Sequence, residues 1–318
     1  MKHPKHMRNS YIKLLTIVSI ALFSIKGNAQ QDPMYTQYMY NMSVINPAYA
    51  IDDMGMLNVG GIYRNQWAGM EGAPETATFF AHTPLTNRLE AGISIVHDEI
   101  GDIVKENNLY ADVAYVLPVS ESTKLSFGVK AGVTFFDADL TRLRTQQEND
   151  PAMQNISEAF PNFGVGTYLF GDNYYVGLSA PNLFTAKHLE NETGLARLGE
   201  ENIHYFLTGG YVFDLNPNLK LKPAFMMRGV EGAPLSVDIT ANFLLYNRFE
   251  AGIAYRLDET VSGLVNFRVT PELRIGYAYD YTTGNLGDYN DGTHEIMVLF
   301  DLDLLGLSKG YNVSPRFF

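Results

Sequence analysis

The side chains that could do chemistry in this 318-residue chain are histidines and carboxylates, and their spacing is not that of a catalytic site. His294 and Glu295 are adjacent in a segment with strand periodicity, so their side chains point to opposite faces and cannot act together. His97, Asp98 and Glu99 are expected in a loop, where acidic side chains usually face water. The sequence has no His-Glu-x-x-His motif and no phosphate-binding glycine loop. No catalytic constellation is therefore visible in the sequence, and a barrel hydrolase would need a reactive residue that the sequence does not mark out.

The best candidate for a metal site is the Asp-rich stretch LGDYNDGT at residues 286–293. Calcium loops of the common type place ligands in a twelve-residue rhythm that ends on a bidentate Glu, and this stretch has neither feature. A turn is the simpler interpretation. The chain contains no cysteine, which excludes disulfides and thiolate metal sites. We expect no metal and no cofactor.

The first 29 residues have the pattern of an export signal. Lys2, Lys5, Arg8 and Lys13 precede an apolar run at 14–25, and small residues at 27–29 form a cleavage site after Ala29. This signal carries five of the 23 basic residues and none of the 35 acidic ones, so the mature chain is strongly acidic. Nucleic acid is therefore not an expected partner, because neutralising phosphates needs clustered Lys and Arg.

From residue 53 to 304, apolar and polar residues alternate in segments of about ten residues. The clearest are KLSFGVKAGVTFF (124–136), PLSVDITANFLL (234–245) and ELRIGYAYDY (272–281). We count about fourteen such segments. This pattern predicts an all-β transmembrane antiparallel β-barrel of about 14 strands, integral to the outer membrane after signal removal and followed by a tail at 305–318.

A soluble sandwich also has strands with one apolar face, but connection lengths favour the barrel. Connections after even-numbered strands are tight, as in TPLTN, VSEST and GDN. Those after odd-numbered strands are mostly longer, including HDEIGDIVKEN and residues 137–161 and 181–203, with short exceptions near Glu231 and Glu259. Outer-membrane barrels alternate short periplasmic turns with longer external loops in this way.

The polar phase of the strands is then expected to face the lumen. It includes Glu90 and Glu250, and the candidates we single out are Lys130, Asp238, Arg256, Arg268, Arg274, Asp280 and Glu295. Both charge signs are interspersed, which favours a network of ion pairs that holds the barrel round. The alternative is the selectivity lining of an open pore.

The stretch QDPMYTQYMYNMSVINPAYA (31–50) is neither a clean strand nor disordered. Its prolines remove backbone donors, whereas its aromatic content is high for a disordered chain. Residues 30–52 are therefore predicted to form a plug or docking segment in the lumen or at the periplasmic mouth. The candidate residues are Asp32, Pro33, Tyr35, Gln37, Tyr38, Asn41, Asn46, Pro47 and Tyr49.

This opening stretch resembles the mature N-terminus of the PorP/SprF family of Bacteroidetes outer-membrane proteins. YRNQWAGMEGAPET (63–76) resembles the family's block after the first strand, through Arg64, Gln66 and Trp67. For Trp67, a membrane-belt position and a docking contact both remain open. HDEIGD, LSFGVKAG, FGVGTYLF, GYAYD and THEIMV follow in family order. The ending resembles the family's C-terminal motif, through Ser314, Pro315, Arg316 and Phe318.

The resemblance implies an outer-membrane subunit of the type IX secretion system, which docks, anchors or helps export secreted cargo such as a gliding adhesin. The implied partners are a secreted type IX substrate or surface adhesin, periplasmic or outer-membrane components of the machine, and the lipid bilayer. It implies no enzyme activity and no cofactor. The alternative is an outer-membrane channel or hydrophobic-solute transporter of the 14-stranded type, since such transporters also carry an N-terminal plug.

Overall fold

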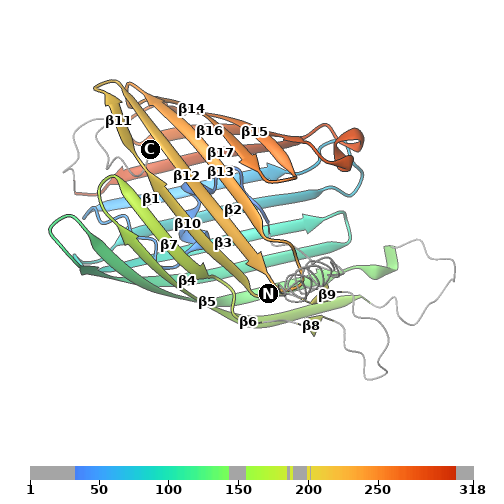
Figure 1. Cartoon of the computed structure of the whole chain (residues 1–318). Helices are drawn as coiled ribbons and strands as arrows, with labels where there is room; N and C mark the ends of the chain where they lie inside the picture. Colours follow the sequence, from blue (N-terminus) through green and yellow to red (C-terminus); the bar gives the residue numbers. More distant parts are fainter. Residues whose placement is uncertain (1–32, 143–154, 185–186, 189–198, 201, 306–318) are drawn as a thin grey trace, which may run out of the picture.

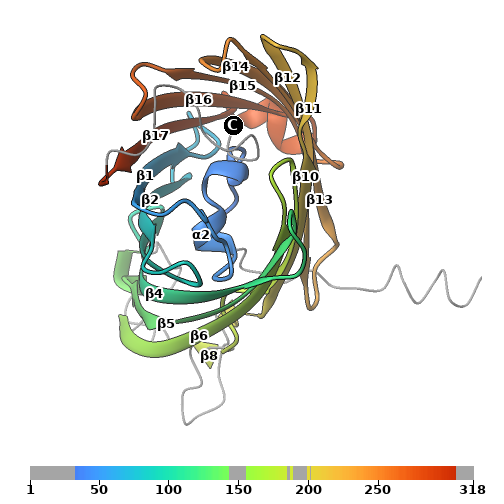
Figure 2. The same ribbon diagram turned by 90° about the vertical axis from the view of Figure 1, so that its left-hand side faces the viewer.

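The computed structural model describes residues 33–142, 155–184, 187–188, 199–200 and 202–305. Within them the chain forms a closed antiparallel β-barrel (Figures 1 and 2). Its fourteen strands are β1 (Met56–Asn65), β2 (Pro74–Pro84), β3 (Leu89–Ile100), β4 (Val104–Pro118), β5 (Lys124–Ala138), β6 (Ile156–Phe170), β7 (Tyr174–Ala180), β10 (His204–Tyr211), β12 (Leu219–Val230), β13 (Ser236–Leu245), β14 (Phe249–Arg256), β15 (Thr260–Arg268), β16 (Leu273–Thr282) and β17 (Thr293–Asp303).

Every barrel strand pairs with its neighbours in the sequence. The ring closes where β1 pairs with β17, from Met56 opposite Asp303 to Asn65 opposite His294. The short β11 (Phe213–Asn216) continues β10 along β12, and β8 (Lys187–His188) pairs with β9 (Gly199–Glu200) outside the barrel sheet. Lipid offers no hydrogen-bond partners to free backbone groups, and a closed ring leaves no strand edge unpaired. The expected all-β barrel is confirmed, and the sandwich is excluded.

Exposure alternates along the strands with a period of two. In β13, Ser236, Asp238 and Thr240 are buried, whereas Ile239 and Phe243 are exposed. The apolar side chains therefore cover the outside of the ring, and the polar ones point into the lumen. This is the reverse of a soluble protein and the arrangement expected of a barrel whose solvent is lipid.

The connections divide between the two ends of the barrel. One end, called here the short-turn end, carries the turns at 85–88, 119–123, 171–173, 217–218, 246–248 and 269–272. At the turn after β13, Tyr246 and Asn247 both have positive φ, as the two central residues of a type I′ turn do, and the Arg248 N–H donates to the Leu245 carbonyl. The opposite end, the long-loop end, carries the connections at 66–73 and 283–292 and those that join β5 to β6 and β7 to β10.

Two expectations about loops are wrong. His97, Asp98 and Glu99 belong to β3, and the connection to β4 is only the turn at 101–103. The strands continue past the apolar band because polar cross-strand pairs replace the lipid-facing ones, including His97 Nδ1 to Asn107 Oδ1 at 2.7 Å and Lys105 Nζ to Glu99 Oε1 at 2.9 Å.

Among the described residues, helical structure is limited to four short elements: η1 (Tyr38–Tyr40), α2 (Met42–Ile45), η2 (Leu140–Arg142) and η3 (Asn285–Tyr289). In the described part of the chain, none of these reaches the length and hydropathy needed to cross a membrane. The first two lie inside the ring, where α2 is seen in the end-on view of Figure 2. They belong to residues 33–53, called here the lumen segment.

Candidate functional site

The lumen segment lies inside the barrel, packed against the inner face of its wall. Tyr38, Gln37 and Asn41 have no exposed surface, and Asn46 has 1%. Apolar side chains of the segment pack against inward-facing aromatic residues of the wall, such as Phe80, Tyr168 and Phe170. Of the nine residues proposed for this segment, Tyr35, Gln37, Tyr38, Asn41, Asn46 and Pro47 are buried, Pro33 and Tyr49 are partly buried, and Asp32 lies outside the described residues.

Near the long-loop end, the segment is held by two carboxylates and a buried arginine. Glu295 accepts the backbone N–H of Thr36 at 2.9 Å and that of Gln37 at 2.8 Å. The Thr36 hydroxyl donates to Asp280 at 2.6 Å. Arg64 donates to Asp280 at 2.8 Å and to Glu295 at 3.0 Å, which neutralises much of their charge. Three strands, β1, β16 and β17, therefore grip one turn of the segment.

The opposite wall holds the middle of the segment. Lys130 Nζ on β5 donates to the Val44 carbonyl at 2.5 Å, and Ser179 Oγ on β7 donates to the Ile45 carbonyl at 2.9 Å. The Asn46 side-chain amide donates to the Thr167 carbonyl on β6 at 3.0 Å. The bonds to Val44 and Ile45 satisfy carbonyl groups that a four-residue helix leaves without intrahelical partners.

Tyr40 connects the segment to a third part of the wall. Its hydroxyl donates to Glu250 on β14, and the cationic groups of Lys222 and Arg274 lie 5.3 Å and 5.0 Å from its ring centroid. Cations over an aromatic face are attracted by the ring quadrupole. Glu250 also accepts from Asn242 at 2.8 Å, so its carboxylate is shared between segment and wall.

At the short-turn end, Glu90 on β3 performs the same task as Glu295. It accepts the backbone N–H groups of Ile51 at 2.7 Å and Asp52 at 2.8 Å. His82 Nε2 lies 3.0 Å from Glu90, and Lys124 pairs with the Asp52 carboxylate. The chain then turns into β1. The lumen segment thus crosses the lumen from the long-loop end to the short-turn end.

Close approach of segment and wall depends on inward-facing glycines, of which two come nearest to the segment. A Cβ on Gly128 of β5 would overlap the Pro47 carbonyl, and one on Gly166 of β6 would overlap the Asn46 side chain. Both stand at inward-facing positions, where any other residue would push the segment away. The absence of a side chain at these two positions therefore leaves the space that Asn46 and Pro47 occupy.

The seven charged residues proposed for the lumen are all buried, each at most 6% exposed. Several are ion-paired: Arg256 with Asp238 at 2.8 Å, Arg274 with Glu250 at 3.7 Å and Arg268 with Asp301 at 3.9 Å. Sequence reasoning missed His82 and treated Arg64 only as part of a motif. Both stand in the inward phase of their strands, which is the signal that could have found them.

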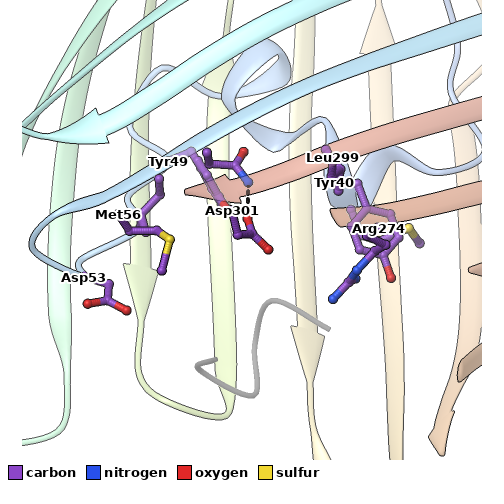
Figure 3. A pocket seen from close by; sticks show the side chains of 10 residues that line it. Tyr40, Tyr49, Asp53, Met56, Arg274, Leu299 and Asp301 are labelled. Carbon is purple, nitrogen blue, oxygen red and sulfur yellow. Dashed lines mark hydrogen bonds between the residues drawn. The ribbon is translucent and has the colours of Figure 1, made fainter. Parts of the chain in front are cut away.

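A small cavity remains beside the segment at the short-turn end (Figure 3). Its volume is about 50 Å³, and Tyr40, Tyr49, Met56 and Arg274 are among its lining residues. Asp53 lies at its edge, where partial burial and then the charges of Asp303 and Asp52 raise the pKa of its carboxyl. A cavity of this size has room for a few water molecules and not for an organic solute.

The other proposed residues lie at the ends of the chain or of the barrel. Gln66 and Trp67 lie at the long-loop end, where the Trp67 backbone N–H donates to Thr293 Oγ1 at 3.1 Å. Trp67 lines a cavity there. Ser314, Pro315, Arg316 and Phe318 lie outside the described residues, as does the proposed signal at 1–29. The described residues include no His, Asp or Glu group able to hold a metal ion.

Solved structures similar to this chain are outer-membrane proteins. A FadL homologue of Pseudomonas aeruginosa superposes with a TM-score of 0.50 at 14% identity, covering 81% of this chain and 93% of that one. Omp33 of Acinetobacter baumannii gives 0.45 at 10% identity, covering 78% and 98%. Identities this low show the fold alone, which is a β-barrel. No curated protein sequence matches the chain.

The sequence itself identifies the family. The model of the type IX secretion system membrane protein PorP/SprF matches residues 27–300, which include the lumen segment and nearly all of the barrel. The ordered motifs, the closed barrel and its apolar exterior agree with that match. The protein is thus an outer-membrane component of type IX secretion, and the chain belongs to the PorP/SprF family.

Proposed function

We propose that this protein is a closed outer-membrane subunit that docks, anchors or helps export secreted type IX cargo, such as a gliding adhesin, and that it works through its surfaces and not through its lumen. The observation that carries the proposal is the lumen segment. It lies in the lumen and is hydrogen-bonded to strands on several sides of the wall, which supports a closed barrel.

The strength of this closure can be estimated from the contacts. Six donors of the segment meet four carboxylates of the wall: the N–H groups of Thr36, Gln37, Ile51 and Asp52, and the hydroxyls of Thr36 and Tyr40. A hydrogen bond to a charged group contributes about 1.5–3 kcal/mol. Because six such bonds would have to break together with the aromatic packing, thermal motion alone does not clear the lumen.

The partner would meet the long-loop end, which faces the cell exterior in barrels of this kind. Residues 142–155 carry Arg142, Arg144, Glu148 and Asp150, so a contact through this loop would be polar and would weaken with salt. Periplasmic components of the machine would meet the short-turn end. The channel or hydrophobic-solute transporter remains the alternative, and it requires the lumen segment to move.

The proposal is tested in the native host. A strain that lacks this chain should lose one or a few type IX substrates from its surface and regain them on complementation. Tagged full-length protein extracted in mild detergent should then retain the same substrate. Shortening residues 142–155 should reduce retention, whereas replacing Ser120, Glu121 and Ser122 at the short-turn end with glycine should not. Normal surface display in the deletion strain would refute the docking role.

A further inference from the structure

The long-loop end contains a cavity of about 630 Å³ that no part of the proposed function uses. This volume is in the range of small-ligand sites. Its wall comes from the long-loop ends of strands distributed around the barrel, through Gln66, Trp67, Pro74, Ile100, Thr260 and Thr293. Its floor is the start of the lumen segment, Pro33 and Met34, together with Arg64.

The cavity therefore lies next to Pro33, where the preceding part of the chain joins the lumen segment. We infer that it receives the first residues of the mature chain, Gln30, Gln31 and Asp32, and that the amino terminus lies on the long-loop side of the membrane. The first barrel strand begins at the opposite end, so the chain would enter the lumen from outside and leave it at the periplasmic side.

The small number of residues before Pro33 supports an amino terminus on the long-loop side of the membrane. If the signal is removed after Ala29, three residues precede Pro33, and three extended residues reach about 10 Å. The apolar band of such a barrel is about 25 Å tall. The amino terminus cannot return to the short-turn end through a lumen that the segment itself fills, because Tyr38, Gln37 and Asn41 are packed there without exposed surface.

The charge of the cavity favours the amino group as its occupant. Asp98, Asp258 and Glu259 line it, and its two arginines are already paired. Arg64 is bound by Asp280 and Glu295, and Arg256 lies 2.8 Å from Asp238 and 3.7 Å from Glu259. The three carboxylates that line the cavity and the three others that pair with its two arginines give the site an excess of negative charge, which attracts a positive α-ammonium group.

Epitope insertion tests directly on which side of the membrane the amino terminus lies. A twenty-residue tag is inserted between Gln31 and Asp32, with matched insertions at Gly232 in the long-loop hairpin after β12 and at Glu121 in a short turn. Antibody should bind the first two on intact cells and the Glu121 insertion only after permeabilisation. An amino-terminal tag that behaves like the Glu121 insertion would overturn the inference.

A second measurement keeps the test independent of the tag. Because the chain has no cysteine, Met34→Cys provides one reactive site at the cavity floor. A membrane-impermeant maleimide applied to intact cells should label it, more slowly than Gly232→Cys because residues 30–32 cover the cavity floor, and should leave Glu121→Cys unlabelled. Labelling of Met34→Cys only after permeabilisation, or only after denaturation, would contradict access from the long-loop side.

Discussion

Replacing Glu295 with glutamine should release the first turn of the lumen segment while leaving the barrel folded. Glu295 accepts two backbone N–H groups, from Thr36 and Gln37, and pairs with Arg64 at 3.0 Å. Glutamine keeps one acceptor oxygen and places an NH₂ group against the second donor. Arg64 retains Asp280 at 2.8 Å, so the wall keeps an ion pair.

The size of the effect follows from these bonds. One hydrogen bond to a charged group is lost and the other becomes neutral, which costs about 2–4 kcal/mol of local stability. Each 1.4 kcal/mol is a factor of ten, so the opened fraction of the turn should rise roughly 30- to 700-fold. Amide hydrogen exchange reads this opening because Thr36 and Gln37 carry the amides concerned.

The assay compares Glu295→Gln with wild type in lipid nanodiscs. Exchange should accelerate in peptides covering residues 33–40 and stay unchanged in β5 and β6, which do not touch Glu295. The matched control is Glu99→Gln, because Glu99 pairs with Lys105 and contacts no part of the lumen segment. Unchanged exchange at residues 33–40, or equal acceleration throughout the barrel, would refute the assignment of Glu295 as an anchor.

Two further substitutions test the wall. Val129→Arg places a charge on the lipid face about halfway along the apolar band and should cost about 2–4 kcal/mol of barrel stability. The yield of this variant in the outer membrane should fall, whereas Val129→Leu should assemble normally. Equal yields of the two variants would mean that this face does not meet lipid. Gly128→Ala should loosen the lumen segment at Pro47 and make the segment more sensitive to protease. The control is Gly263→Ala, which should behave as wild type because its Cβ meets nothing within 4 Å. Identical digestion of the two variants would contradict the role of Gly128 in the close approach.

The strands, and which of their side chains point into the lumen, could be predicted from the sequence because apolar and polar residues alternate along each strand. The turn at Tyr246 and Asn247 and the order of short and long connections were likewise readable. The extent of β3 and β4 was not, because His97 to Glu99 are polar and the alternation stops there. Cross-strand pairs, which periodicity does not register, continue the ladder to the turn at 101–103.

The contacts of the lumen segment lay beyond sequence reasoning for a different reason. Thr36 is bonded to Glu295, 259 positions away, and Ile51 to Glu90, 39 positions away. A segment without period 2 or 3.6 contains no local signal for such partners. Its prolines and tyrosines indicated that it packs on something. Only the structure gives its direction through the lumen and the carboxylates that hold it.

The closed lumen is tested most directly by single-channel recording of the purified full-length protein in planar bilayers. The docking account predicts silent membranes across the voltage range in which a reference porin shows stable steps. Insertion is verified by recovering the protein from the bilayer-forming vesicles. Stable, reproducible conductance steps from the intact protein would contradict the account and favour the channel.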